Sequence, residues 1–271
     1  MPELLSKYQP PGKTAQTQNI TPASAGWKYV GFEVFELKAG ESFSQQTEDQ
    51  EVCLVLVGGK ADIKTTNLDL SDVGDRMSPF ERKKPYAVYV PNEDHFTVTA
   101  TTDAEIAVCK APGKGGFKAR LITPDDIGSE SRGKGFNKRH VHNILPETEP
   151  ADSLLVVEVY TDEGNTSSYP SHKHDQDNAP HETYLEETYY HRIDPPQGFV
   201  FQRVYTEDGE IDESMAAYNK DVVQVPKGYH PVATLAGYNS YYLNVMAGPN
   251  RRWCFVWEEA HNWVNSPAYG D

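Results

Sequence analysis

The chain has 271 residues, 38% hydrophobic and 24% charged, so it is long enough and apolar enough to form a packed globular core. Its formal net charge is −15. Binding to nucleic acid or to an anionic membrane surface needs clustered lysine and arginine, so we expect neither partner.

The N-terminus and the cysteines indicate the compartment. MPELLSKYQP lacks the basic and then apolar pattern of a signal peptide, and no stretch approaches the roughly 18 apolar residues of a membrane span. The three cysteines are odd in number and far apart, at Cys53, Cys109 and Cys254. This usage predicts free thiols in a reducing compartment, and hence a cytoplasmic location.

The first half of the chain is predicted to be built of strands. Residues 1–26 are polar and proline-bearing and are predicted to form an N-terminal arm. Short apolar runs separated by turn residues then follow at 27–37, 51–63, 86–91, 95–102 and 105–112. This spacing is typical of a sandwich or barrel, so we assign residues 27–115 to an N-terminal β domain.

The second half repeats this organisation. Residues 116–150 are rich in glycine and charge, which predicts a linker. A second series of strands then begins, and residues 151–271 are assigned to a C-terminal β domain. We therefore expect an all-β chain with two tandem barrel domains and few short helices.

Four residues of the second half form a candidate metal site. If His172–His174 is extended, both imidazoles leave the same side of the strand, with Cα atoms roughly 6.5–7 Å apart. Two rings at that separation can reach one metal ion. A carboxylate on a neighbouring strand, Glu187, and a distant histidine, His230, complete the predicted ligand set.

An internal repeat supports this site. The pattern V-P-x-x-x-H occurs at 90–95 and again at 225–230. A glutamate opens an apolar strand before each copy: Glu51 lies 44 residues before His95, and Glu187 lies 43 residues before His230. No histidine stands in SFSQQTEDQ before Glu51, so only the second half is expected to hold a full ligand set.

The combination of a duplicated β unit, His-x-His, a glutamate and a later histidine resembles the cupin family of jelly-roll β-barrels. The segments SHKHD, LEETYYHR, GFVFQRVYT, DVVQVPKGYHPV, YYLNVMAGP, RGKGFNKRHVHNILP and FERKKPYAVYVP resemble the 5-deoxy-glucuronate isomerases of bacterial inositol catabolism. The uronate ketol-isomerases of pectin breakdown are similar more distantly. The resemblance implies two tandem cupin (jelly-roll β-barrel) domains.

The resemblance also implies an activity. It is the metal-assisted aldose–ketose isomerisation of 5-deoxy-D-glucuronate to 5-dehydro-2-deoxy-D-gluconate in myo-inositol catabolism. The cofactor would be a divalent ion acting as a Lewis acid. We expect zinc, and the ligand types also fit manganese, iron or nickel.

The sequence leaves the ligand carboxylate and the base open. Glu182, Glu186 and Glu187 are all available, and the repeat favours Glu187, with Glu186 on the opposite face of the strand. Candidates for the catalytic acid or base are Glu186, Tyr242 and His191, or a hydroxide on the metal.

A uronate carries a carboxylate, which arginine binds in a bidentate manner. The predicted substrate contacts are Lys173, Arg192, Gln202, Arg203, Tyr229 and Asn244. A second His-x-His, His140 and His142, has no carboxylate strand at matching spacing and is predicted to be structural.

Two other functions stay open on the residues alone. Cupin sites also host metal-dependent dioxygenases, and a cupin can bind a sugar without turnover. The expected partner is a small uronate. Duplicated cupins often pair, so we also expect a homo-oligomer, a dimer or higher.

Overall fold

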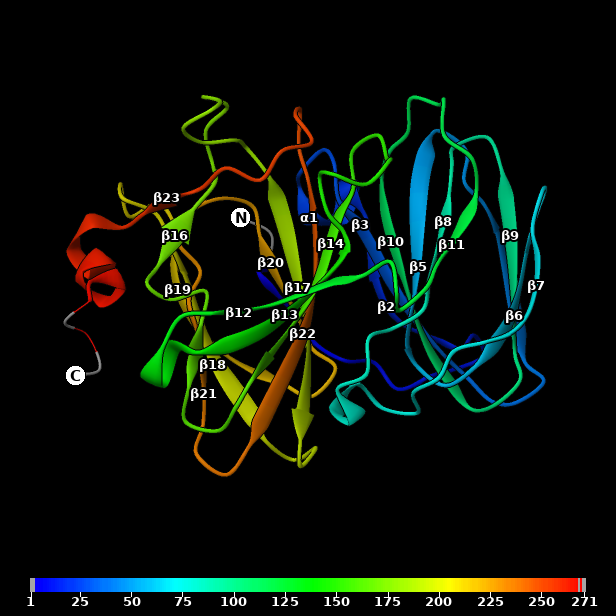
Figure 1. Cartoon of the computed structure of the whole chain (residues 1–271), viewed down its shortest axis with the longest axis horizontal. Helices are drawn as coiled ribbons and strands as arrows, with labels where there is room; N and C mark the ends of the chain where they lie inside the picture. Colours follow the sequence, from blue (N-terminus) through cyan, green and yellow to red (C-terminus); the bar gives the residue numbers. More distant parts are fainter. Residues whose placement is uncertain (1–2, 268, 270–271) are drawn as a thin grey trace. The chain divides into compact units, whose positions relative to one another are not determined.

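The computed structural model describes residues 3–267 and residue 269, and these form two compact units (Figure 1). The N-terminal unit comprises Gln9–Gly128 and Asn143–Val156. The C-terminal unit comprises the chain up to Tyr8, Ser129–His142 and the chain from Val157 onward.

The N-terminal unit has two antiparallel sheets, ordered β11-β8-β5-β10-β3-β2 and β4-β9-β6-β7. Its elements are β2 (Gln16–Ile20), α1 (Pro22–Ala25), β3 (Gly31–Leu37), β4 (Ser42–Gln46), β5 (Gln50–Gly58), β6 (Ala61–Thr65), β7 (Asp69–Val73), η1 (Pro79–Glu81), β8 (Ala87–Val90), β9 (His95–Ala100), β10 (Ala104–Pro112) and β11 (Arg120–Ile122).

The core of this unit lies between its two sheets. Val52, Leu54 and Leu56 alternate along β5 and share one face, because side chains in a strand alternate sides. They pack in one cluster with Ile63 of β6 and Phe96 of β9, which belong to the smaller sheet. Burial of these apolar faces holds the sheets together.

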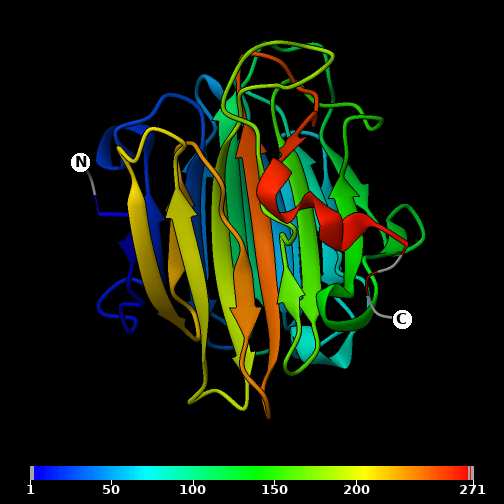
Figure 2. The same ribbon diagram turned by 90° about the vertical axis from the view of Figure 1, so that its left-hand side faces the viewer.

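The C-terminal unit is built on a seven-stranded sheet, β1-β20-β17-β22-β14-β13-β12, a four-stranded sheet, β15-β21-β18-β19, and the pair β16-β23 (Figure 2). The elements of these sheets and their connections are β1 (Leu5–Ser6), β12 (Gly128–Arg132), η2 (Gly135–Asn137), β13 (Arg139–Leu145), β14 (Leu155–Thr161), β15 (Thr166–Ser167), β16 (His172–Lys173), β17 (Glu186–Asp194), β18 (Phe199–Tyr205), β19 (Asp212–Tyr218), β20 (Val222–Val225), β21 (Val232–Thr234), β22 (Asn239–Ala247), β23 (Val256–Trp257) and η3 (Glu259–Asn265). The first residue of β12, the end of β13 from Asn143 and the start of β14 up to Val156 belong to the N-terminal unit.

Strand β17 positions the candidate site. It lies between β20 and β22, and its pairing with β22 runs without a register shift from Glu186 to Asp194. Glu187, Tyr189 and His191 therefore share one face of β17. Gln202 of β18, in the four-stranded sheet, hydrogen-bonds His191, so this face is turned toward that sheet and into the unit.

The prediction of an all-β chain with few short helices is confirmed, since α1 has four residues and the other helical segments are 3₁₀ turns. Among the described residues, no helix has the length and apolar character needed to cross a membrane.

The structure distributes two predicted segments differently. The predicted arm, 1–26, contributes β1 to the seven-stranded sheet and β2 to the N-terminal unit. The apolar side chains of Leu4, next to β1, and Ile20, at the end of β2, are buried. The predicted linker, 116–150, contains β11, β12 and β13. The sequence did not reveal these strands, because charged residues occupy positions where an apolar residue is expected. In β13, for example, the buried position at the start of the strand is taken by Arg139.

Candidate metal centre

Two of the predicted ligands come from the short strand β16 and the residue after it. His172 pairs with Trp257 of β23, and Lys173 pairs with Val256. The extended backbone turns Lys173 away and leaves the rings of His172 and His174 on one side, with centroids 6.0 Å apart. The geometry expected of the His-x-His motif is therefore present.

The other two predicted ligands come from β17 and from the turn before β21. Glu187 is the second residue of β17 and lies on its interior face. His230 follows a turn in which Gly228 has φ +90°, a conformation that favours glycine. A Cβ on Gly228 would lie 2.4 Å from the carbonyl oxygen of Tyr205, so the turn also has no room for another residue.

These four side chains converge. Ligand nitrogens of His172, His174 and His230 all lie within 4.8 Å of one another. Oε2 of Glu187 lies 3.0 Å from Nε2 of His174 and 3.2 Å from Nε2 of His230. All four residues are buried.

The ring protons of two histidines are fixed by backbone carbonyls. Nδ1 of His174 donates to the carbonyl oxygen of Leu185 at 3.1 Å, and Nδ1 of His230 donates to that of Gly228 at 2.8 Å. A carbonyl only accepts, so in a neutral ring Nε2 carries a lone pair. Both lone pairs then point toward the Glu187 carboxylate.

Two buried nitrogens of the centre lack a well-formed hydrogen bond. Within the described chain, Nδ1 of His172 has no hydrogen-bond partner, and Nε2 of His230 has only the Glu187 carboxylate nearby, at 3.2 Å. Buried polar atoms are normally satisfied, so an imidazole lone pair that faces a carboxylate calls for a cation between them. A divalent cation satisfies such a set of imidazole lone pairs and carboxylate oxygen, so these residues fit a metal ion.

The shifted pKa values of Glu187 and His172 favour the ionised carboxylate and the neutral imidazole, the forms that bind a metal ion. Burial alone would raise the pKa of Glu187, but His174 and His230 outweigh it and lower that pKa to about 2. Burial, together with His230 and His174 nearby, holds the pKa of His172 well below its usual value. Burial also lowers the pKa of His174, but Glu187 reverses this and raises it.

Four polar side chains, those of Tyr189, His191, Tyr242 and Asn244, continue the interior face beyond Glu187, and we call them the polar wall. Tyr189 pairs with Asn244, and His191 pairs with Tyr242, so these four side chains share that face. The Tyr189 ring centroid lies 5.6 Å from that of His230 and 4.8 Å from that of Tyr242. Any molecule bound at the centre would meet this wall.

Two of the predicted substrate contacts, Gln202 and Asn244, lie beside or within this wall. Gln202 accepts a 2.8 Å hydrogen bond from Nε2 of His191 and donates to the carbonyl oxygen of His230 at 3.4 Å. Asn244 donates to the carbonyl oxygen of Thr188 at 3.1 Å. Gln202 thus connects the wall to a predicted ligand.

Four other predicted substrate contacts have partners elsewhere. Their partners are Asp175 and Glu182 for Lys173, Asn219 for Arg192, Asp212 for Arg203, and Glu207 for Tyr229. Arg203 is also exposed and lies over the Tyr205 ring. The structure does not bring these four side chains to the centre, and it engages Glu182, one of the alternative ligands, with Lys173.

Glu186 lies on the opposite face of β17 from Glu187, where Tyr184 Oη lies 3.5 Å from its Oε1.

The strand registers also correct the alignment of the internal repeat. Val90 pairs with Val52, and Val225 pairs with Glu187. Glu187 therefore corresponds to Val52, and Glu51 corresponds to Glu186, so the pairing of Glu51 with Glu187 is wrong by one residue. The sequence is consistent with this alignment, because Glu51 lies 44 residues before His95 and Glu186 lies 44 residues before His230.

Glu51 has a structural role in the N-terminal unit. Its buried carboxylate accepts hydrogen bonds of 2.6–2.7 Å from the backbone N–H groups of Asp152, Ser153 and Leu154, and one of 2.7 Å from Tyr89 Oη. Backbone donors to an ionised acceptor form strong hydrogen bonds. The carboxylate is fully used in holding residues 152–154.

Replacement of Glu51 by glutamine should destabilise the N-terminal unit by about 3 kcal/mol, because a neutral amide turns one acceptor into a donor facing backbone N–H groups. Chemical denaturation would measure the loss. Metal content should be unchanged, since Glu51 lies outside the centre. Unaltered stability would contradict the structural role.

The sequence did not point to several residues around the centre. Ser168 Oγ lies 3.0 Å from Tyr189 Oη and 3.5 Å from Tyr242 Oη, and so joins the two phenols. Phe255 and Trp257 pack on His172, with ring centroids 4.8 and 5.6 Å away. Their distance along the chain from the candidate ligands left no spacing signal.

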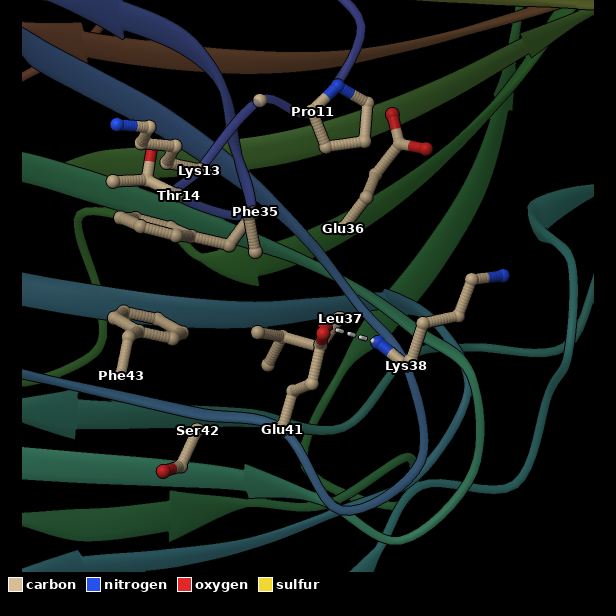
Figure 3. A pocket seen from close by; sticks show the side chains of 12 residues that line it. Pro11, Lys13, Thr14, Phe35, Glu36, Leu37, Lys38, Glu41, Ser42 and Phe43 are labelled. Atoms are coloured by element: carbon tan, nitrogen blue, oxygen red, sulfur yellow. Dashed lines mark hydrogen bonds between the residues drawn. The ribbon is translucent and has the colours of Figure 1, made fainter.

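Two other features lie outside the group of candidate metal ligands found among the described residues. His140 and His142 hydrogen-bond Ser131 and Glu158, in agreement with structural roles. A cavity of about 540 Å³ in the N-terminal unit is lined by residues 11–15, 35–38 and 41–43 (Figure 3). Its lining contains the stacked rings of Phe35 and Phe43, and no histidine or cysteine.

Known structures identify the fold. Over 95% of this chain and 80% of the other, the fold matches a variant of oxalate decarboxylase from Bacillus subtilis, with a TM-score of 0.65 and 13% identity. At that identity the likeness concerns the fold alone. The fold is that of a tandem cupin, as the sequence predicted, and the candidate metal centre lies in its second barrel.

The chain belongs to the KduI/IolB family, which it matches over residues 4–264. It is 57% identical to the 5-deoxy-glucuronate isomerase of Geobacillus kaustophilus, covering 97% of this chain and 96% of that protein. The enzyme of the same name from Bacillus subtilis is 52% identical over 90% of this chain and 91% of its own length. The crystal structure of an IolB-like protein from Salmonella typhimurium matches with a TM-score of 0.95 and 59% identity, over 97% of this chain and all of that chain. The protein is therefore an enzyme, an isomerase.

Proposed function

We propose that this isomerase converts 5-deoxy-D-glucuronate to 5-dehydro-2-deoxy-D-gluconate in myo-inositol catabolism, with the help of a divalent metal ion. The relatives named for this substrate support the proposal. The observation that carries it is the convergence of three imidazoles and the Glu187 carboxylate in the second barrel. Such a centre suits a reaction that develops negative charge on a sugar oxygen.

We assign the ligand roles to His172, His174, Glu187 and His230. A divalent ion held there would supply Lewis acidity, which stabilises negative charge on a carbonyl oxygen. Leu185 and Gly228 orient two of the rings through their carbonyl oxygens, and such outer contacts fix the tautomer of a ligand. Zinc is the first choice, and manganese, iron or nickel also fit imidazole and carboxylate ligands.

An aldose–ketose isomerisation moves a hydrogen between adjacent carbons, and we propose that His191 accepts it as a proton from one carbon and returns it to the other. Burial lowers the pKa of His191 to about 4, so the ring is neutral near pH 7. Nε2 donates to Gln202, which leaves the lone pair on Nδ1, and no partner for Nδ1 occurs in the described chain. A neutral imidazole with a vacant lone pair is the form that accepts a proton.

Tyr242 suits the complementary role. Burial raises the pKa of its phenol, so the hydroxyl stays protonated and can donate to a developing oxyanion. Glu186 was the third candidate, and its position on the outer face of β17 counts against it. Asn244 lies on the interior face and is proposed to contact the sugar.

The proposal is tested by nuclear magnetic resonance in D₂O with 5-deoxy-glucuronate as substrate. We expect the aldehyde signal to disappear, a chelator to abolish the conversion, and a divalent ion to restore it. Solvent deuterium in the product would support proton transfer to His191. Metal-loaded protein that leaves the aldehyde unchanged would contradict the function, and conversion without deuterium would count against the base.

We also propose a cytoplasmic location and a homo-oligomer. All three cysteines are free thiols, two of them buried, as in proteins of reducing compartments. Analytical ultracentrifugation would contradict the assembly if it gave the mass of a single 30.4 kDa chain.

A further inference from the structure

Arg139 is a buried cation in the segment 116–150, which was predicted to be a linker. It begins β13 and is only 7% exposed. The alternation of side chains along β13 also shows on which face of the sheet Arg139 lies. The His142 ring packs on Tyr160, which packs on Tyr241, the neighbour of Tyr242 along β22. His142 therefore lies on the outer face, and Arg139, three residues earlier, lies on the interior face with Tyr242.

The hydrogen bonds of Arg139 leave its charge unbalanced. Nη1 donates to the carbonyl oxygens of Asn137 and Tyr169, at 3.1 and 3.4 Å. In the described part of the chain, no acidic side chain lies within ion-pair distance of this guanidinium. A buried charge without a counter-charge is costly, so a ligand that supplied the counter-charge would remove this cost.

The surroundings of Arg139 hold it in place. Gly133 has φ +75°, and a Cβ there would lie 2.9 Å from Nη1 of Arg139 and 2.3 Å from the carbonyl oxygen of Asn137. The backbone thus packs closely on the guanidinium. A side chain fixed in this way loses little conformational freedom when it binds a ligand.

Arg139 is also adjacent to the wall that continues from the metal centre. Tyr169, which accepts one of its hydrogen bonds, directly follows Ser168. Ser168 joins the hydroxyls of Tyr189 and Tyr242, and the Tyr189 ring lies beside His230. A molecule bound at the centre and extending along this wall would bring its far end to Arg139.

We propose that Arg139 binds the carboxylate of the substrate, and so selects a uronate over a neutral aldose. This inference rests on the proposed function, in which the aldehyde end lies at the metal centre. Both hydrogen bonds of Arg139 come from Nη1, so Nε and Nη2 offer the edge that binds a carboxylate in a bidentate manner. The substrate then provides the missing counter-charge.

The test compares Arg139→Met and Arg139→Lys with the wild type. We expect Arg139→Met to raise KM for 5-deoxy-glucuronate about 10- to 100-fold, the loss typical of a hydrogen-bonded charge pair, with metal content retained. Arg139→Lys keeps the positive charge but loses the planar guanidinium that binds a carboxylate through two hydrogen bonds. Its KM should therefore lie between those of the wild type and Arg139→Met. Calorimetry should show the same order for binding of D-glucuronate, whereas weak binding of D-glucose should not change.

Arg76 of the N-terminal unit is a matched control. It is also buried, and it donates to the backbone carbonyls of Val57 and Lys83. Arg76→Met should lower thermal stability and leave KM and glucuronate binding unchanged, which separates a structural effect from loss of a binding group.

The two proposals fail in different ways. If the wild type converts 5-deoxy-glucuronate but Arg139→Met leaves KM and glucuronate binding unchanged, the inference is overturned and the function stands. If the wild type does not convert this substrate but binds glucuronate through Arg139, the proposed function is wrong and the carboxylate site is supported.

Discussion

Glu187→Gln is expected to lose its metal on dialysis and to lower turnover at least about a hundredfold. Outer contacts of a metal ligand are worth about 10- to 100-fold in affinity, and a direct anionic ligand should be worth at least as much. Glutamine keeps the volume of the side chain but removes the charge that balances a dication among neutral imidazoles. Elemental analysis and turnover of the dialysed protein would measure both effects.

Glu186→Gln is the matched control, since Glu186 is the adjacent residue and is equally buried but lies on the other face of β17. Its metal content should stay at the wild-type level, although burial of a changed side chain can lower stability. Loss of metal from Glu186→Gln, with retention by Glu187→Gln, would move the ligand to the outer face and contradict the centre described above.

The convergence of the four candidate ligand side chains could be predicted from the sequence because it depends on local rules. Strand alternation places His172 and His174 on one side, whatever the rest of the fold. His230 could be linked to them by the repeated V-P-x-x-x-H pattern. Residues that are fixed by strand geometry or by a repeat can thus be assigned without coordinates.

The repeat itself was aligned one residue out of register, and the reason is physical. A one-residue shift exchanges the two faces of a strand, and both faces of β17 are buried, so hydrophobic pattern alone does not set the alignment. Pairing with β20 and β22 sets it, and pairing is a property of the fold. Glu187 was nevertheless chosen over Glu186, with the misaligned repeat as one of the reasons.

The predicted substrate cations show the limit of sequence proximity. Arg192 and Arg203 were chosen because they stand near Glu187 along the chain, but they bind Asn219 and Asp212. Arg139 is 48 residues before Glu187 and reaches the interior through the neighbouring strands of one sheet. Which cation lacks an anion depends on the completed set of contacts, so the sequence does not reveal it.

Gly248→Ala is expected to destabilise the C-terminal unit by about 3 kcal/mol, at the upper end of the usual range for overpacking. Gly248 directly follows β22, and a Cβ there would lie 1.9 Å from the carbonyl oxygen of Tyr184. No side-chain rotation relieves a contact between a Cβ and a backbone atom, so the strand ends must separate. Thermal unfolding would measure the loss.

The same substitution should weaken the metal centre, because Tyr184 stands only three residues before Glu187 and any displacement is passed into the start of β17. Gly12→Ala is the control: its backbone is not in the left-handed region and a Cβ there would meet nothing within 4 Å, so stability should change by less than about 0.5 kcal/mol. Equal stability of the two variants would contradict the close approach at Gly248. A destabilised Gly248→Ala variant with full metal affinity would show that the ligand geometry is set by the β17 pairing rather than by the contact at Tyr184.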